Sequence, residues 1–405
     1  MNNEKPQLTG HTPTLLACFL QFDLSFMLWV MMGALGVFIA ESLKLNASQK
    51  ALLVAIPILS GSLLRIPLGL LSDRIGGKIV GSGILVFLFI PLSIGYFSGE
   101  NLSALIAAGL MLGVAGASFA VALPLASRWY PPEKQGLAMG IAAAGNSGTI
   151  ITNLLAPRLA TAYGWHNVFL LAMIPLVVVL IAFVLMAKES PNQTKGQPFS
   201  KYLKIMKTAD LWWFCLLYSI TFGGFVGLSS FLPLFFRDQY HVTPIQAGYI
   251  TALVAFVGSG IRPIGGWLAD KVGGVKLLSF VLFGVSFAYL FASLLLGLNV
   301  MVPILMGGMA CLGIGNGAIF QIVPQRFREE IGLATGVVGT IGGVGGFLLP
   351  MLLGNFKQAF GTFASGFMVL GGLALTAAVV IRILVAIQQG WKFSWKQPTA
   401  QPSEV

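Results

Sequence analysis

Twelve apolar segments divide this chain, and each is long enough to cross a bilayer, for which a helix needs about 20 apolar residues. The chain of 405 residues is 56% hydrophobic and 9% charged, with a mean hydropathy of +0.87. A soluble domain carries a charge on about a quarter of its residues. We therefore predict an all-α integral membrane protein, with spans at residues 13–40, 47–71, 79–98, 102–127, 134–160, 166–187, 209–236, 244–269, 276–297, 300–326, 331–357 and 362–389.

The lysines and arginines predict the orientation of these spans. Twelve spans place both termini on one side, and sixteen basic residues fall in the segments of that side. Five fall on the opposite side: Lys44, Lys50, Arg158, Arg237 and Lys357. Basic residues accumulate in cytoplasmic loops. We expect a multi-pass protein of the cell inner (plasma) membrane with both termini in the cytoplasm, and we attribute the net charge of +11 to this bias rather than to a nucleic-acid partner.

One long polar interruption, residues 188–208, separates the first six spans from the last six. We expect an N-terminal six-helix half at 1–187, a cytoplasmic linker at 188–208, a C-terminal six-helix half at 209–389 and a cytoplasmic tail at 390–405. The tail carries aromatic and lysine residues suited to a membrane interface.

The two halves share a repeated motif. Residues 61–78, GSLLRIPLGLLSDRIGGK, return 197 positions later at 258–275 as GSGIRPIGGWLADKVGGV, and the stretch 136–140 returns at 332–336. Parallel repeats of six spans are typical of major facilitator transporters. Residues 69–78 resemble the loop motif of that superfamily between spans 2 and 3. The sequence thus predicts a twelve-span major facilitator fold built from two six-helix pseudo-symmetric halves.

An arginine occupies the same place in each repeat. Arg65 and Arg262 lie eight residues before Asp73 and Asp270, which is about 12 Å along a helix and close to the bilayer centre. An arginine there costs at least ~2.5 kcal/mol. We predict that one anion is held between the two arginines. The alternative is that each arginine pairs with an acid or a carbonyl as a structural strut.

The chain most closely resembles the nitrate/nitrite porter family of the superfamily, of the NarK/NasA type, from Thr14 to the last span. The resemblance lies in the glycine-rich stretches 140–148 and 336–346, together with the arginines of spans 2 and 8. It implies a secondary active transporter of nitrate and/or nitrite that works by alternating access. The eleventh span lacks the asparagine that the fifth span has at Asn146.

The resemblance also implies a set of substrate-binding residues: Arg65, Arg262, Tyr218, Phe222, Phe119 and Asn146. A guanidinium offers parallel donors that match two coplanar oxygens of a planar anion. Aromatic faces restrict the tilt of such an anion, and a hydroxyl or an amide donates a hydrogen bond to it. The alternative for the aromatic residues is ordinary packing, and for Asn146 it is a hydrogen bond between helices.

Four charged residues at the ends of spans 2 and 8 have an expected role as a gate. By resemblance to the superfamily, Asp73, Arg74, Asp270 and Lys271 are expected to gate the cytoplasmic ends of the spans.

Asp23 in the first span is our candidate for proton coupling, because anion uptake against a negative-inside potential needs a cotransported cation. We hypothesise that ionised Asp23 competes with the anion for an arginine. The alternative is a permanent ion pair between Asp23 and an arginine.

We expect nitrate/proton symport for uptake, and two other transport functions are the alternatives. A nitrate/nitrite antiporter needs no proton site, and a carrier of small organic anions also uses paired arginines. We do not expect an enzyme, a cofactor or a metal site, because no nucleophile and base are paired and no metal-ligand spacing occurs. The expected partners are nitrate or nitrite, protons and the lipid bilayer, and we expect a monomer.

Overall fold

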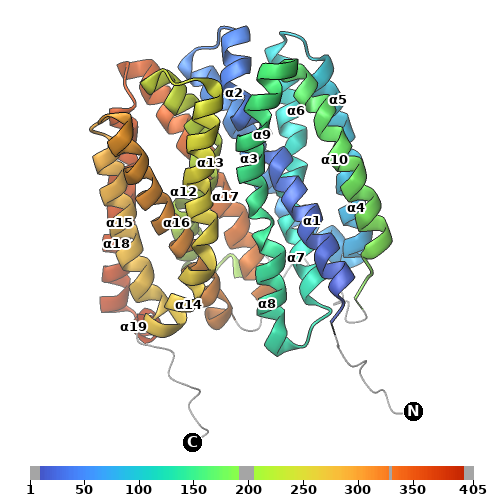
Figure 1. Ribbon diagram of the computed structural model, residues 1–405. Coiled ribbons are helices and arrows are strands. Elements are labelled where there is room, and N and C mark those ends of the chain that lie inside the picture. The colour runs from blue at the N-terminus through green and yellow to red at the C-terminus, as the bar shows by residue number, and fades with distance from the viewer. Residues whose placement is uncertain (1–9, 191–204, 328–330, 396–405) are drawn as a thin grey trace, which may run out of the picture.

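The computed structural model describes residues 10–190, 205–327 and 331–395, which form one helical bundle (Figure 1). A helix satisfies its backbone hydrogen bonds internally, as a segment inside a bilayer requires. The helices of the first half are α1 (Thr12–Trp29), α2 (Met31–Ser42), α3 (Ala47–Ile75), α4 (Gly77–Phe87), α5 (Phe89–Phe97), α6 (Leu102–Gly116), α7 (Phe119–Ser127), α8 (Pro132–Ala143), η1 (Ala144–Ser147), α9 (Gly148–Tyr163) and α10 (Trp165–Met186). Those of the second half are α12 (Ala209–Tyr240), α13 (Pro244–Gly260), α14 (Arg262–Val272), α15 (Gly274–Ala292), α16 (Leu298–Arg326), α17 (Ile331–Phe360), α18 (Ala364–Ile387) and α19 (Gln389–Trp395).

The predicted all-α membrane fold is confirmed. Within the described ranges, eleven helical stretches are long and apolar enough to cross a membrane. The predicted span at 134–160 is the twelfth, and it is divided into α8 and α9 by the 3₁₀ turn η1.

Other spans are also built from two consecutive helices, and two of these breaks lie at the candidate site. Span 4 is interrupted at Ala117 and Ser118, between α6 and α7. Span 8 is interrupted at Ile261, between α13 and α14, where Pro263 lacks the N–H that would continue the helix. A break leaves backbone carbonyls without their usual partner, so a side chain can bond to them.

The two halves lie side by side, with the helices coloured blue to green on one side of Figure 1 and those coloured yellow to red on the other. The most extensive packing across the seam is that of α3 along α17, α9 along α13, and α2 against α12. Glycine permits the close approach, since a Cβ on Gly343 would lie within about 2 Å of Ser62 Oγ, and one on Gly248 would lie 2.4 Å from the Asn153 carbonyl oxygen. The start of α1 and the end of α19 lie on the same side of the bundle, which is called the terminal side below.

The start of the predicted tail packs onto the bundle. Trp391 of α19 is buried and stacks on Phe214 with ring centroids 5.0 Å apart, and its indole N–H donates to Asp210. Residues 396–405 of the predicted tail and 191–204 of the predicted linker lie outside the described residues.

Candidate functional site

Arg65 lies in the middle of α3 and is 2% exposed. Its Nε donates to the Gly116 carbonyl at 3.3 Å, which the break of span 4 makes accessible, and its Nη1 donates to the Gly339 carbonyl at 2.7 Å. Gly116 belongs to the first half and Gly339 to α17 of the second. Nη2 is buried and has no hydrogen-bond partner among the described residues. Arg65 therefore bridges the two halves and retains one nitrogen, Nη2, whose N–H groups are both unused.

Three aromatic rings surround this guanidinium. The Cζ atom of Arg65 lies 4.9 Å from the ring centroid of Phe222, 5.2 Å from that of Phe119 and 5.5 Å from that of Trp29. The ring faces stabilise the cation and exclude water from it. Sequence reasoning selected Phe119 and Phe222 but missed Trp29, which is also held by a 2.7 Å hydrogen bond from its indole N–H to the Pro57 carbonyl.

Arg262 lies at the first residue of α14, directly after the break in span 8. Arg65, Arg262 and Tyr218 are near enough to one another to interact electrostatically. Tyr218 is fully buried and stacks on Phe222 with centroids 4.9 Å apart, and its hydroxyl lies beside the guanidinium of Arg262. The two arginines of the repeat thus lie in one shared region beside a buried hydroxyl.

Phe320 of α16 completes this group, and sequence reasoning missed it. The Cζ atom of Arg262 lies 5.7 Å from the centroid of its ring. The same ring packs edge-on against Tyr218 at 5.1 Å and contacts Phe119 across the seam at 6.1 Å.

Asn146 lies in the 3₁₀ turn η1 and is 4% exposed, and its Oδ1 is buried without a hydrogen-bond partner in the described part of the chain. The interhelical hydrogen bond considered for this side chain is not made by that oxygen. Among the contacts of the described residues, none joins Asn146 to the two arginines, so its place in the site stays a prediction.

Asp23 contacts the same turn. Its carboxylate accepts a 2.5 Å hydrogen bond from the Ser147 hydroxyl. Gly145 and Gly148 allow this approach, because a Cβ on either would lie 2.8 Å or less from backbone atoms of Asp23. Among the ion pairs of the described residues, none joins Asp23 to an arginine. The structure therefore places Asp23 on the serine that follows Asn146, a partner that sequence reasoning missed.

The four predicted gate residues lie at the terminal-side ends of α3 and α14. Asp73 forms an ion pair with Arg128, which follows α7 in the same half. The ammonium of Lys271 lies 3.9 Å from the ring centroid of Trp267, and Asp270 is exposed. Arg74 is also exposed.

The chemistry of the site follows from its charges. No described carboxylate forms an ion pair with Arg65 or Arg262, so the region carries an uncompensated positive charge. Its free donors are the Arg65 guanidinium and the Tyr218 hydroxyl, and its walls are aromatic. Within the described residues no group of three or more His, Cys, Asp or Glu side chains lies close enough to hold a metal ion. Such a site suits a small, flat anion.

Comparison with known families agrees with this fold. Residues 17–350 match the family model described as Major Facilitator Superfamily. A bacterial homolog to the human lysosomal transporter Spinster, solved in an inward-facing and unoccupied conformation, has a TM-score of 0.67 and 20% sequence identity. The likeness covers 95% of this chain and 96% of that one.

Curated relatives are similar over almost the whole length. The nitrite extrusion protein of Bacillus subtilis is 34% identical, over 100% of this chain and 99% of its own. The probable nitrate transporter NarT of Staphylococcus carnosus is 33% identical, over 94% and 97%. The probable nitrate/nitrite antiporter NarK1 of Thermus thermophilus is 31% identical, over 92% and 88%.

Proposed function

This chain belongs to the nitrate/nitrite porter family of the Major Facilitator Superfamily, and we propose that it carries nitrate and/or nitrite across the membrane by alternating access of its two halves. The names of its relatives support the substrate, and the packing of the halves along α3 and α17 supports the mechanism. In this fold, substrate sites lie near the bilayer midplane between the repeats.

The observation that carries the proposal is the buried guanidinium of Arg65, which has no carboxylate partner and retains an unpartnered Nη2. The carbonyls that accept from Nε and Nη1 are neutral and leave the buried charge itself unpaired, so this group is suited to a mobile anion. Nitrate offers coplanar oxygens to the fork of donors, and Phe119, Phe222 and Phe320 provide ring faces beside it. Arg262 and Tyr218 then hold the anion from the second half.

We place both termini in the cytoplasm, on the evidence of the sixteen basic residues on the terminal side against five on the other. The gate roles of Asp73, Arg74, Asp270 and Lys271 then belong to the cytoplasmic ends of the spans. The boundaries of the linker and the tail proposed from the sequence fit this orientation.

For the coupling mode we favour nitrate/proton symport with Asp23 as the proton site. Ionised Asp23 accepts from Ser147 and so ties α1 to η1, the turn that carries Asn146. A proton on the carboxylate weakens this tie and allows η1 to move relative to α1. We propose this route in place of the sequence-based hypothesis that Asp23 competes with the anion for an arginine, because the Asp23 carboxylate bonds to Ser147.

Nitrate/nitrite exchange is the second mode, and the name of the Thermus thermophilus relative favours it. Exchange of one monovalent anion for another moves no net charge and needs no proton site.

Reconstitution in proteoliposomes tests the function and separates the modes. We expect labelled nitrate to enter faster when an inward proton gradient is imposed. Entry stimulated only by nitrite trapped inside would establish exchange. Entry in neither condition would exclude nitrate as the substrate.

A further inference from the structure

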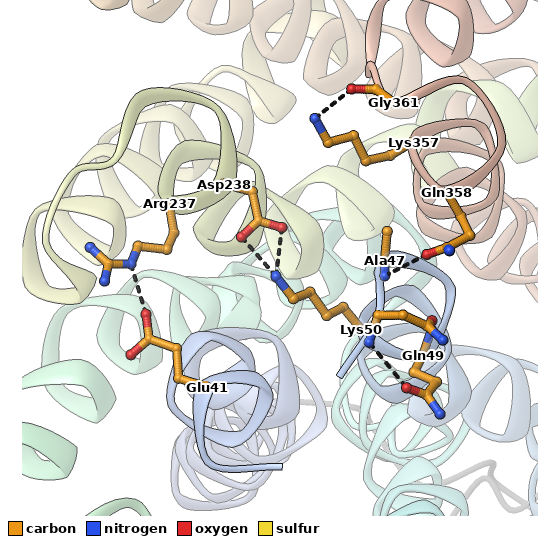
Figure 2. Close-up of polar contacts among 10 residues, drawn as sticks. Glu41, Ala47, Gln49, Lys50, Arg237, Asp238, Lys357, Gln358 and Gly361 are labelled. Carbon is orange, nitrogen blue, oxygen red and sulfur yellow. Dashed lines mark hydrogen bonds and ion pairs between the residues drawn. The ribbon is translucent and has the colours of Figure 1, made fainter. Parts of the chain in front are cut away.

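Two ion pairs join the halves on the side opposite the terminal side (Figure 2). Lys50, near the start of α3, donates to both carboxylate oxygens of Asp238 at 2.8 Å. Nε of Arg237 donates to Glu41 of α2, also at 2.8 Å. Arg237 and Asp238 are consecutive residues near the end of α12. One short segment of the second half therefore presents a cation and an anion to matching partners in the first half.

The Lys50–Asp238 pair is partly shielded from water. Both side chains are 21% exposed. Together with Phe231, Leu234 and Phe363, they line a hollow that has no space for a water molecule. Partly buried charges are screened less than exposed ones. This pair is therefore the stronger of the two, because the side chains of Arg237 and Glu41 are 34% and 51% exposed.

Two neighbouring contacts also cross the seam on this side. The backbone N–H of Ala47 donates to the side chain of Gln358 in α17 at 3.1 Å (Figure 2). Farther along the seam, the guanidinium of Arg158 in α9 lies 4.7 Å from the ring centroid of Tyr249 in α13.

The terminal side shows a different pattern. Asp73 pairs with Arg128 inside the first half, and Asp210 pairs with Arg326 inside the second. These two ion pairs thus each stay within one half, whereas the Lys50–Asp238 and Glu41–Arg237 pairs on the opposite side cross between halves. Pairs within a half survive a rigid-body movement, but pairs across the seam must break when that side opens.

We propose that the Glu41–Arg237 and Lys50–Asp238 pairs form an outer latch, which holds the carrier closed to the outside and open to the cytoplasm. This inference rests on the alternating-access function and the orientation proposed above. The latch stabilises only the state in which the outer ends of the helices meet, so it shifts the balance between the two states toward that state. The strength of the latch then determines how readily the carrier returns to the state that is open to the outside, where it accepts a new anion.

Thiol labelling tests the latch without any substrate. Leu234 is 1% exposed beside Lys50 and Asp238, so a cysteine in its place reacts with a membrane-impermeant maleimide only when the outer side opens. The assay uses right-side-out vesicles that contain the full chain with Leu234→Cys, and the chain without this change reports any labelling of the native cysteines. We expect Lys50→Gln or Asp238→Asn to raise the labelling rate about three- to fivefold, as loss of one such pair implies.

Matched variants make the result decisive. Lys44→Gln removes the same charge from an exposed lysine on the same side and should leave the labelling rate unchanged. The charge exchange Lys50→Asp with Asp238→Lys should return the rate toward that of the parent. Unchanged labelling in both single variants, or a charge exchange that labels no more slowly than they do, would overturn the latch. Because labelling needs no nitrate, a failed nitrate uptake assay would leave the labelling result valid. Labelling that occurs only in inside-out vesicles would refute the proposed orientation of the carrier.

Discussion

Nη1 of Arg65 donates a 2.7 Å hydrogen bond to the backbone carbonyl of Gly339, so the buried cation of one half is fixed on the backbone of the other. Its Nε is fixed in the same way on the Gly116 carbonyl. Carbonyl groups orient the guanidinium plane without cancelling its charge. The third nitrogen, Nη2, is left to bind an anion. Because the other two nitrogens bond to different halves, a relative movement of the halves shifts the guanidinium.

Replacement of Arg65 or Arg262 by lysine should strongly impair transport. Lysine keeps the charge but loses the planar fork, and a hydrogen bond to a charged group contributes about 1.5–3 kcal/mol, so we expect uptake efficiency to fall about 10- to 100-fold. The measurement is the initial rate of nitrate entry into proteoliposomes. Arg382→Lys is the control, since Arg382 is exposed and bonds to Ser279. Normal entry with Arg65→Lys would contradict the role of the fork.

Phe320→Ala should weaken substrate binding although sequence reasoning did not select this residue. Its ring lies against Arg262, Tyr218 and Phe119. A contact between a cation and an aromatic ring contributes about 0.5–2 kcal/mol, so the KM for nitrate should rise about 3- to 30-fold. Phe287→Ala, at a ring that is 62% exposed, should leave the KM unchanged. Equal KM values for the two variants would remove Phe320 from the site.

Asp23→Asn should separate proton coupling from exchange. The amide keeps the size of the side chain and its contact with Ser147 but cannot release a proton. We expect an imposed proton gradient to have no effect on nitrate entry in this variant, whereas nitrate/nitrite exchange continues. Glu100→Gln, at an exposed acid that bonds to Ser42, serves as the control. Gradient-driven accumulation at the wild-type level in Asp23→Asn would show that Asp23 is not the proton site.

Gly345→Ala should destabilise the fold, whereas Gly336→Ala should not. A Cβ at Gly345 would lie 2.4 Å from the carbonyl oxygen of Ser219 in α12, while one at Gly336 meets nothing within 4 Å. Overpacking of this kind costs about 1–3 kcal/mol. The melting temperature of the purified protein in detergent should therefore fall for Gly345→Ala. Identical melting curves would mean that α12 and α17 are packed less closely than described.

The sequence predicted the scaffold because bilayer insertion depends on local composition. Each apolar segment must satisfy its backbone inside lipid, so the spans were visible without knowledge of their neighbours. The 197-residue repeat placed Arg65 and Arg262 at equivalent positions, and the structure brings both near Tyr218.

The partners of these side chains were not predictable, because they depend on how the halves dock. The carbonyls of Gly116 and Gly339 carry no sequence signal, and the choice of Ser147 over an arginine for Asp23 follows from the close packing of α1 on η1. Phe320 is one of thirty phenylalanines, and only its contact across the seam distinguishes it. The outer latch was missed for the same reason, since its charges belong to helix ends far apart in the chain.

Equilibrium binding of labelled nitrate to the purified carrier tests the two-arginine site most directly, with nitrite, formate and oxalate as competitors. We predict binding that nitrite displaces and that larger, divalent oxalate does not, and we predict its loss when Arg65 and Arg262 are both replaced by alanine. Nitrate binding that survives this double replacement, or that oxalate displaces as readily as nitrite does, would contradict the account.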